Sequence, residues 1–221
     1  MAGYYTVKQG DYLSKIAAQN GFSDYNTIWN DPNNADLKTQ RQNPNVLYPG
    51  DQLYIPDKQT KDYSKPVDQQ HTFKSTASPL KLRLKLARFY APPIANTPCD
   101  LYVGGNLVKV TSDANGIVEQ TIPKTAQDAK LTVHQQITVK DQSLPNDFDI
   151  TIKIGNLDPV DKLSGQVARL SNLGYYRQDL DQVDDPEFVS AVEEFQCDNG
   201  LTVDGDCGPQ TQAKLKDVHG C

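Results

Sequence analysis

The chain has little of what several large classes of protein require. Among its 221 residues there are only three histidines, four cysteines, one tryptophan and one methionine. No run approaches the roughly 20 apolar residues that a transmembrane helix needs. The formal net charge of -6 leaves no basic excess to neutralise nucleic-acid phosphates or anionic lipid headgroups. We therefore expect neither nucleic-acid binding nor membrane insertion.

The N-terminus also lacks the basic and then apolar segments that mark a signal peptide. After Met1 the chain runs almost directly into Tyr5-Thr6-Val7, which has the pattern of folded structure. We therefore expect synthesis in the cytoplasm. If the protein acts in the periplasm or at the cell wall, a signal-independent route must carry it there.

The cysteines and histidines match no common metal spacing. Cys99 stands alone, and Cys197, Cys207 and Cys221 cluster near the end of the sequence. An odd cluster defines no disulfide framework, and its spacing to His219 fits no common zinc finger. A short loop makes the Cys197 and Cys207 pair the easiest to oxidise, although free or buried thiols remain the simpler expectation. We expect no metal and no other cofactor.

Composition and periodicity divide the chain into several small domains. Hydrophobic residues make up 37% of the sequence, which suits cores of modest size. A polar run poor in apolar residues is predicted to be a linker. The expected segments are 1–57, a linker at 58–71, a β-rich spacer at 72–156, and a helical unit at 157–221.

The spacer segment has the period of two that is typical of β-strands. Leu80, Leu82, Leu84 and Leu86 alternate with charged or polar residues, which predicts a strand with one solvated face. Further strands are expected at 100–103, 108–111, 117–122, 130–133 and 149–154, with turns at 104–106 and 113–116. This pattern predicts an antiparallel β-sandwich. Residues 93–99 and 111–116 resemble carboxypeptidase-regulatory or immunoglobulin-like modules.

The last segment changes to helical spacing from about Pro159. One apolar face ends at Gly174, and a second ends at Asn199-Gly200. A third helix is expected from Pro209 to Val218, with Ala213, Leu215 and Val218 facing inward. These signals predict a compact three-helix unit.

The first segment resembles a LysM domain. Its opening is Tyr5-Thr6-Val7-Lys8-Gln9-Gly10-Asp11-Tyr12-Leu13-Ser14-Lys15-Ile16-Ala17, and its close is Val46-Leu47-Tyr48-Pro49-Gly50-Asp51-Gln52-Leu53-Tyr54-Ile55-Pro56. The resemblance implies a βααβ fold that binds glycans containing N-acetylglucosamine, such as peptidoglycan and chitin. It places the glycan between the loop after the first strand and the loop before the second. The implied groove residues are Gly10, Asp11, Tyr12, Leu13, Asn45, Val46 and Leu47.

Local physical chemistry agrees with that fold. Gly10 permits a tight turn, and Asp11 is predicted to cap the helix that begins near Tyr12. For Gly10, Asp11 and Leu13, a role in folding alone remains an open alternative. Between Trp29 and Pro49 the chain is longer than a short LysM domain, so an insertion is expected beside the groove.

The last segment resembles the small helical peptidoglycan-binding domain that is often attached to cell-wall hydrolases. The matching stretches are 167–175, 191–196 and 199–211, the last containing Asp204-Gly205 and Gly208-Pro209. The two resemblances together imply a multi-domain α+β protein that binds peptidoglycan without catalysis and targets a larger assembly to the cell wall. Wall-binding modules of this kind resemble parts of contractile injection machines, such as phage tail baseplates and type VI secretion spikes.

An enzymatic alternative is a cell-wall hydrolase or an L,D-transpeptidase-like protein. His219-Gly220-Cys221 resembles the catalytic segment of L,D-transpeptidases, in which an imidazole activates a thiolate. No strand follows Cys221 in this sequence to build a substrate pocket. We therefore expect no catalytic residues.

Overall fold

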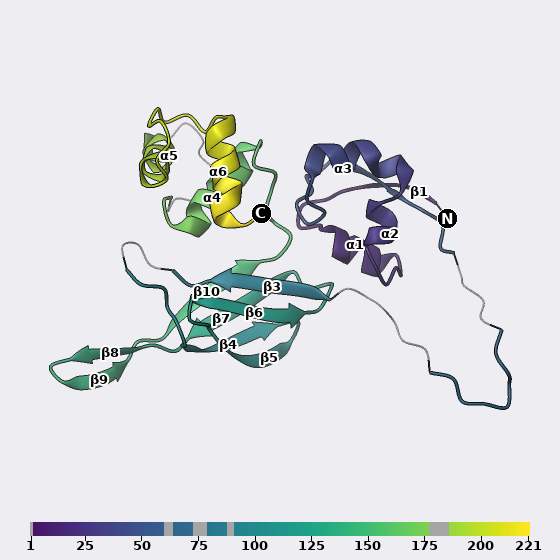
Figure 1. The fold of residues 1–221 in the computed structure, drawn as a ribbon, viewed down its shortest axis with the longest axis horizontal. Helices are drawn as coiled ribbons and strands as arrows, with labels where there is room; N and C mark the ends of the chain where they lie inside the picture. The colour runs from purple at the N-terminus through teal and green to yellow at the C-terminus, as the bar shows by residue number, and fades with distance from the viewer. Residues whose placement is uncertain (1, 60–63, 73–78, 88–90, 177–185) are drawn as a thin grey trace.

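The computed structural model describes residues 2–59, 64–72, 79–87, 91–176 and 186–221. The fold is mixed α+β, as predicted: helices and one small sheet near the N-terminus, antiparallel sheets in the centre, and helices at the C-terminus (Figure 1). The described residues form separate hydrophobic cores within 7–55, 80–154 and 160–215. We refer to these parts as the N-terminal, central and C-terminal units.

The N-terminal unit is a two-stranded sheet covered by short helices. Strands β1 (Gly3–Thr6) and β2 (Gln52–Ile55) pair antiparallel, and Tyr5 lies opposite Leu53. Between them come α1 (Leu13–Gln19), α2 (Asn26–Trp29), the 3-10 helix η1 (Pro32–Asn34) and α3 (Ala35–Arg41). The expected insertion therefore adds η1 and α3 to the two-helix plan.

Asn34 joins this insertion to the sheet. Its side chain is fully buried and donates to the carbonyls of Ile28 and Tyr54, each at 2.8 Å. Its Oδ1 accepts from the Tyr54 amide, also at 2.8 Å. Because a buried amide must be hydrogen-bonded, these contacts hold the insertion against β2.

The central unit contains two sheets that enclose one core. A four-stranded sheet has the order β10-β7-β4-β5, and β3 pairs with β6 in a second sheet. The bounds are β3 Leu80–Lys85, β4 Pro98–Val103, β5 Asn106–Thr111, β6 Ile117–Ile122, β7 Asp128–Val133 and β10 Phe148–Lys153. The core lies between the sheets, with Leu101 and Leu131 from one and Val118 and Ile122 from the other. The predicted alternation in β3 is confirmed by its half-buried leucines.

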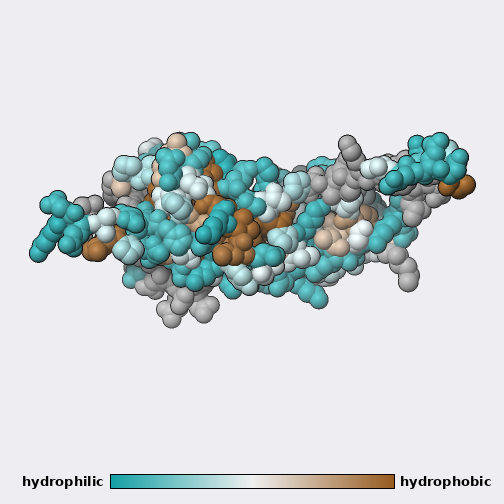
Figure 2. Space-filling model, turned by 90° about the horizontal axis from the view of Figure 1, so that it is seen from below, coloured by the Kyte–Doolittle hydropathy of each residue, from teal (hydrophilic) through white to brown (hydrophobic). Residues whose placement is uncertain are grey.

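A further hairpin extends from the central unit and was not predicted. Strands β8 (Gln136–Val139) and β9 (Gln142–Pro145) pair with each other. The hairpin projects away from the sheets (Figure 1) and carries apolar side chains beside hydrophilic ones (Figure 2). Ile137 and Leu144 lie opposite each other there and are 40% and 43% exposed.

The C-terminal unit has the predicted three helices. They are α4 (Leu163–Leu173), α5 (Pro186–Asp198) and α6 (Pro209–His219), and α4 ends at Gly174 in the left-handed region. Leu215 is fully buried as predicted. The inward placement of Ala213 and Val218 is wrong, since both are exposed. Ala213 lies two residues from Leu215, which places it on the opposite side of an α-helix.

Among the described residues, no helix combines the length and apolar character needed to cross a membrane.

Candidate glycan-binding sites

The loop after β1 is held by Asp11. Its carboxylate accepts from the Tyr5 hydroxyl at 2.7 Å and from the Lys8 amide at 3.0 Å, and it lies 3.2 Å from Lys15 Nζ. Burial alone would raise the pKa of Asp11, but these hydrogen bonds and the lysine charge outweigh it and lower the pKa. The prediction that Asp11 caps the helix is wrong, because Tyr12 is the N-cap residue of α1. Asp11 instead accepts hydrogen bonds that hold the loop before the helix.

The loop before β2 is held by a second ion pair. Arg41, at the end of α3, donates to both oxygens of Asp51 at 2.8 and 2.7 Å. Asp51 Oδ2 also accepts from the Tyr48 amide at 2.9 Å. Arg41 lies in the insertion, and this bidentate contact was not predicted from the sequence. Each of the two loops that flank the predicted groove is therefore held by a buried carboxylate with several partners.

The predicted groove residues lie on these two loops and, for Leu13, at the start of α1, but most of them are covered. Asp11, Tyr12, Leu13, Val46 and Leu47 are at most 6% exposed. Leu13 and Leu47 belong to the core of the N-terminal unit. Gly10 is half-buried, and of the seven residues only Asn45 is exposed. The glycan-binding role of the seven residues stays a prediction.

Tyr12 is buried by the central unit. Its hydroxyl donates to the carbonyls of Lys124 and Ala126, at 3.0 and 2.6 Å, more than a hundred residues along the chain. Burial raises the pKa of Tyr12 to about 12, so the hydroxyl stays a donor at neutral pH. The segment that follows β10 also passes beside this part of the N-terminal unit (Figure 1).

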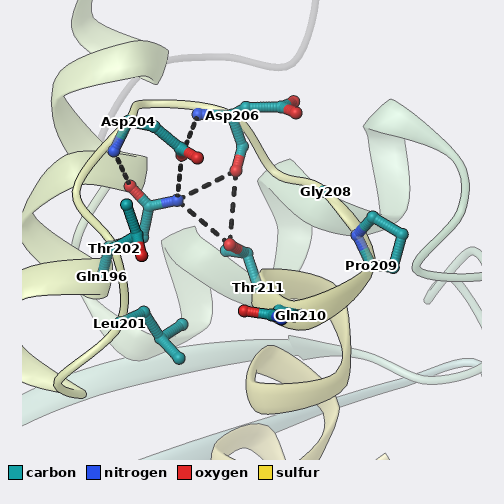
Figure 3. Close-up of a pocket in the computed structure, with 9 residues that line it drawn as sticks. All are labelled: Gln196, Leu201, Thr202, Asp204, Asp206, Gly208, Pro209, Gln210 and Thr211. Carbon is teal, nitrogen blue, oxygen red and sulfur yellow. Dashed lines mark hydrogen bonds between the residues drawn. The ribbon is translucent and has the colours of Figure 1, made fainter.

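A second candidate site lies on the C-terminal unit and is organised by Gln196. This side chain of α5 is 1% exposed. Its amide nitrogen donates to Asp204 Oδ1, the Asp206 carbonyl and Thr211 Oγ1 at 2.7 to 3.0 Å. Its oxygen accepts from the amides of Asp204 and Gly205, both at 3.0 Å. One buried amide thus shapes the loop between α5 and α6 (Figure 3).

That loop and the start of α6 line a depression of about 390 Å³. Its rim combines carboxylate, hydroxyl and amide groups with the apolar faces of Leu201 and Pro209 (Figure 3). Hydrogen bonds from the Asp206 amide and from Gln196 lower the pKa of Asp204. A mixed polar and apolar surface of this kind suits a sugar, whose hydroxyl and acetamido groups alternate with flat apolar faces. The lining residues are Gln196, Leu201, Thr202, Asp204, Asp206, Gly208, Pro209, Gln210 and Thr211.

The three helices and the loop between α5 and α6 lie largely in a segment that matches a known protein family. Residues 167–215 match the family described as "Putative peptidoglycan binding domain". Residues 5–31 match the LysM domain family, so both resemblances are confirmed. A search of curated proteins and a search of solved structures give no match to the chain.

The LysM match ends before the insertion. It begins at Tyr5, within β1, and continues through α1 and α2 to Asp31, next to η1. The structure nevertheless returns the chain to β2, which pairs with β1 as a LysM sheet requires.

The histidine and cysteine near the C-terminus do meet. His219 Nδ1 lies 3.2 Å from Cys221 Sγ, and Asn172 Nδ2 lies 3.1 Å from His219 Nε2. Burial, helped by the charge of Arg169, lowers the pKa of His219 to about 4. Burial also raises the pKa of the Cys221 thiol. At neutral pH the pair is an imidazole and a thiol without charge, which does not favour a nucleophilic thiolate.

The cysteines carry no cross-link in the structure, in which all four are free thiols. Among the described residues, no group of three or more histidine, cysteine, aspartate or glutamate side chains is arranged to hold a metal ion. The organising role of Gln196 was not predicted from the sequence. The available signal was a glutamine directly after Phe195, within the apolar face of a helix.

Proposed function

We propose that the chain is a non-catalytic peptidoglycan-binding protein that anchors a larger assembly to the bacterial cell wall. Both matched families are binding domains, which supports peptidoglycan binding. The observation that carries the proposal is the open polar depression on the matched C-terminal segment. Shallow polar sites leave much of a glycan solvated, so we expect a dissociation constant of roughly micromolar to millimolar.

Cosedimentation with purified peptidoglycan sacculi tests this function. The full chain should pellet with sacculi without lowering their turbidity, whereas a hydrolase would clear the suspension. Absence of the chain from the pellet would refute wall binding. Clearing by the pure protein would refute the non-catalytic assignment.

Exposed residues of the depression offer a sharper test. The double substitution Thr202→Ala with Gln210→Ala removes two rim groups that are not part of the core. It should weaken retention on sacculi at least about fivefold, the effect of losing one or two hydrogen bonds. The matched control is Gln142→Ala with Thr151→Ala, at exposed positions of the central unit. Equal retention of both double variants would show that the depression is not the wall-binding surface.

The assembly that we propose as partner is a contractile injection apparatus, through secretion-spike or phage-tail proteins. Such a machine would also supply the signal-independent route to the cell wall. In a host with this apparatus, deleting its contractile sheath should abolish delivery of the chain to the periplasm. Unchanged delivery in the deletion strain would refute this route.

A further inference from the structure

We propose that the LysM domain is self-occluded: the chain's own residues 155–162, with the loop at 124–126, cover the predicted glycan-binding loops, and glycan binds there only after the N-terminal unit is released. This inference rests on the proposed function, because it takes the loops after β1 and before β2 to be the glycan-facing ones. It adds that the C-terminal depression is open while the N-terminal site is closed.

The first contact is made by Tyr12. This ring is 2% exposed although it lies outside the apolar core of its own unit. Its hydroxyl is bound to two carbonyls of the central unit, of Lys124 and Ala126. Nearby, Lys124 Nζ donates to the Ser23 carbonyl at 2.5 Å. A groove residue is thus buried by another part of the chain, and a sugar cannot reach it in this conformation.

The second contact is made by the segment that leaves β10. A Cβ atom added to Gly155 would lie 2.3 Å from Tyr12 Cδ1 and 3.0 Å from the Gly10 carbonyl oxygen. A Cβ atom on Gly10 would in turn lie 3.6 Å from Asn156 Oδ1. The covering backbone therefore packs directly on the first loop, and only a glycine fits at position 155.

The third contact reaches the second loop. Lys162 Nζ lies 5.4 Å from the centre of the Tyr48 ring, within cation–π range. Arg41, which holds that loop through Asp51, has Nη1 4.0 Å from Asp161 Oδ1. One continuous stretch thus touches the loop after β1 at its start and the loop before β2 at its end. This is the path that a glycan between the two loops would follow.

Release does not require unfolding. The N-terminal and central units have separate cores. In the described residues, the contacts that hold the closed state include three hydrogen bonds, made by Tyr12 and Lys124, the Arg41–Asp161 ion pair and the stacking of Lys162 on the Tyr48 ring. A closed state held by such contacts lowers the apparent affinity of a ligand by the fraction of molecules that are open. By linkage, a glycan that binds the open state must promote release.

The substitution Gly155→Ala in the full chain tests this, because it places the excluded Cβ against Tyr12 without altering a predicted groove residue. The matched control is Gly105→Ala. Gly155 and Gly105 have φ of 77° and 79°, but a Cβ on Gly105 meets nothing within 4 Å. Both variants carry the same backbone strain, and only one should displace the covering segment.

The readouts are the affinity for chitotetraose and the hydrogen exchange of residues 8–13. The Gly155→Ala chain should bind at least about tenfold more tightly than the natural chain and exchange faster at 8–13. The Gly105→Ala chain should do neither. Lys124→Ala is a milder opening variant at the surface, and we expect about a threefold gain, the effect of one lost hydrogen bond.

Several results would overturn the proposal. They are unchanged exchange in Gly155→Ala, faster exchange with unchanged affinity, or an equal gain in Gly105→Ala. If Gly155→Ala does not fold, unchanged affinity of Lys124→Ala decides against it. Retention of every chain on sacculi with no binding of chitotetraose would refute self-occlusion and leave the proposed function standing. Failure of the natural chain to pellet with sacculi would instead refute the proposed function.

Discussion

Substitution of Gln196 by alanine should destabilise the C-terminal unit by about 3 kcal/mol. The change leaves the amides of Asp204 and Gly205 without their acceptor. Both lie in a loop that water reaches, so each costs about 1 kcal/mol, at the lower end for an unsatisfied group. Loss of the buried methylene adds about 1 kcal/mol. The depression should also lose its shape, since Gln196 holds both ends of its wall (Figure 3).

Native-state hydrogen exchange of α4, α5 and α6 measures this loss directly. Tryptophan fluorescence cannot, because Trp29 is the one tryptophan and belongs to the N-terminal core. Gln210→Ala is the matched control for stability, as this glutamine is exposed, and it should cost less than about 0.5 kcal/mol. A loss below about 1 kcal/mol in Gln196→Ala, or one equal to the control, would refute the assigned organising role.

Three further predictions concern pH and the thiols. Hydrogen bonds that the His134 ring donates to the carboxylates of Asp147 and then Asp100 raise the pKa of His134. Its stabilisation of the β8–β9 hairpin is therefore full below pH 6.5 and lost as pH rises through the raised pKa. NMR titration of its ring should show this, and Asp147→Asn should lower the midpoint. His219 gives the opposite pH dependence of stability. Because its pKa is about 4, its contribution to the stability of the C-terminal unit is full above pH 6.5 and is lost as pH falls toward 4. Thermal melts of His219→Gln should lack this dependence. Burial raises the pKa of Cys221, so iodoacetamide should modify the exposed Cys197 first, as followed by mass spectrometry. The variant Cys221→Ser should keep sacculus binding. Faster modification of Cys221 than of Cys197 would revive the enzymatic alternative.

Much of the fold follows from local signals in the sequence. The Leu80 to Leu86 alternation and the left-handed glycines at 104, 105 and 116 specify strands and turns through nearest neighbours alone. Pro209 at the start of α6 and Gly174 after α4 mark helix ends for the same reason. Such features depend on a few consecutive residues, which is why the sequence predicted them.

The β8–β9 hairpin escaped prediction because its turn lacks the usual residues. Lys140 and Asp141 adopt φ of 49° and 63°, where glycine or asparagine is expected. All four residues of β9 are exposed, so this strand has no buried face to impose a clear alternation. Neither of the two signals that identify a hairpin was therefore present.

The covering of Tyr12 was beyond sequence analysis for a different reason. The LysM resemblance implied that this residue lies in the loop after the first strand, and the structure has it directly before α1. Its partners, Lys124 and Ala126, contribute main-chain carbonyls that any residue type would provide. A pattern of side chains in the sequence therefore cannot predict such a contact between distant parts of a chain.

The connection between β2 and β3 determines what the N-terminal unit could do once released. It comprises the 24 residues between Ile55 and Leu80. A polar chain of this length has a root-mean-square span of about 27 Å and a fully extended limit of about 80 Å. The released unit would therefore search a volume only a few nanometres across while the C-terminal unit stays on the wall. Within that volume its local concentration is in the millimolar range, which is enough to engage a neighbouring glycan strand despite weak intrinsic affinity.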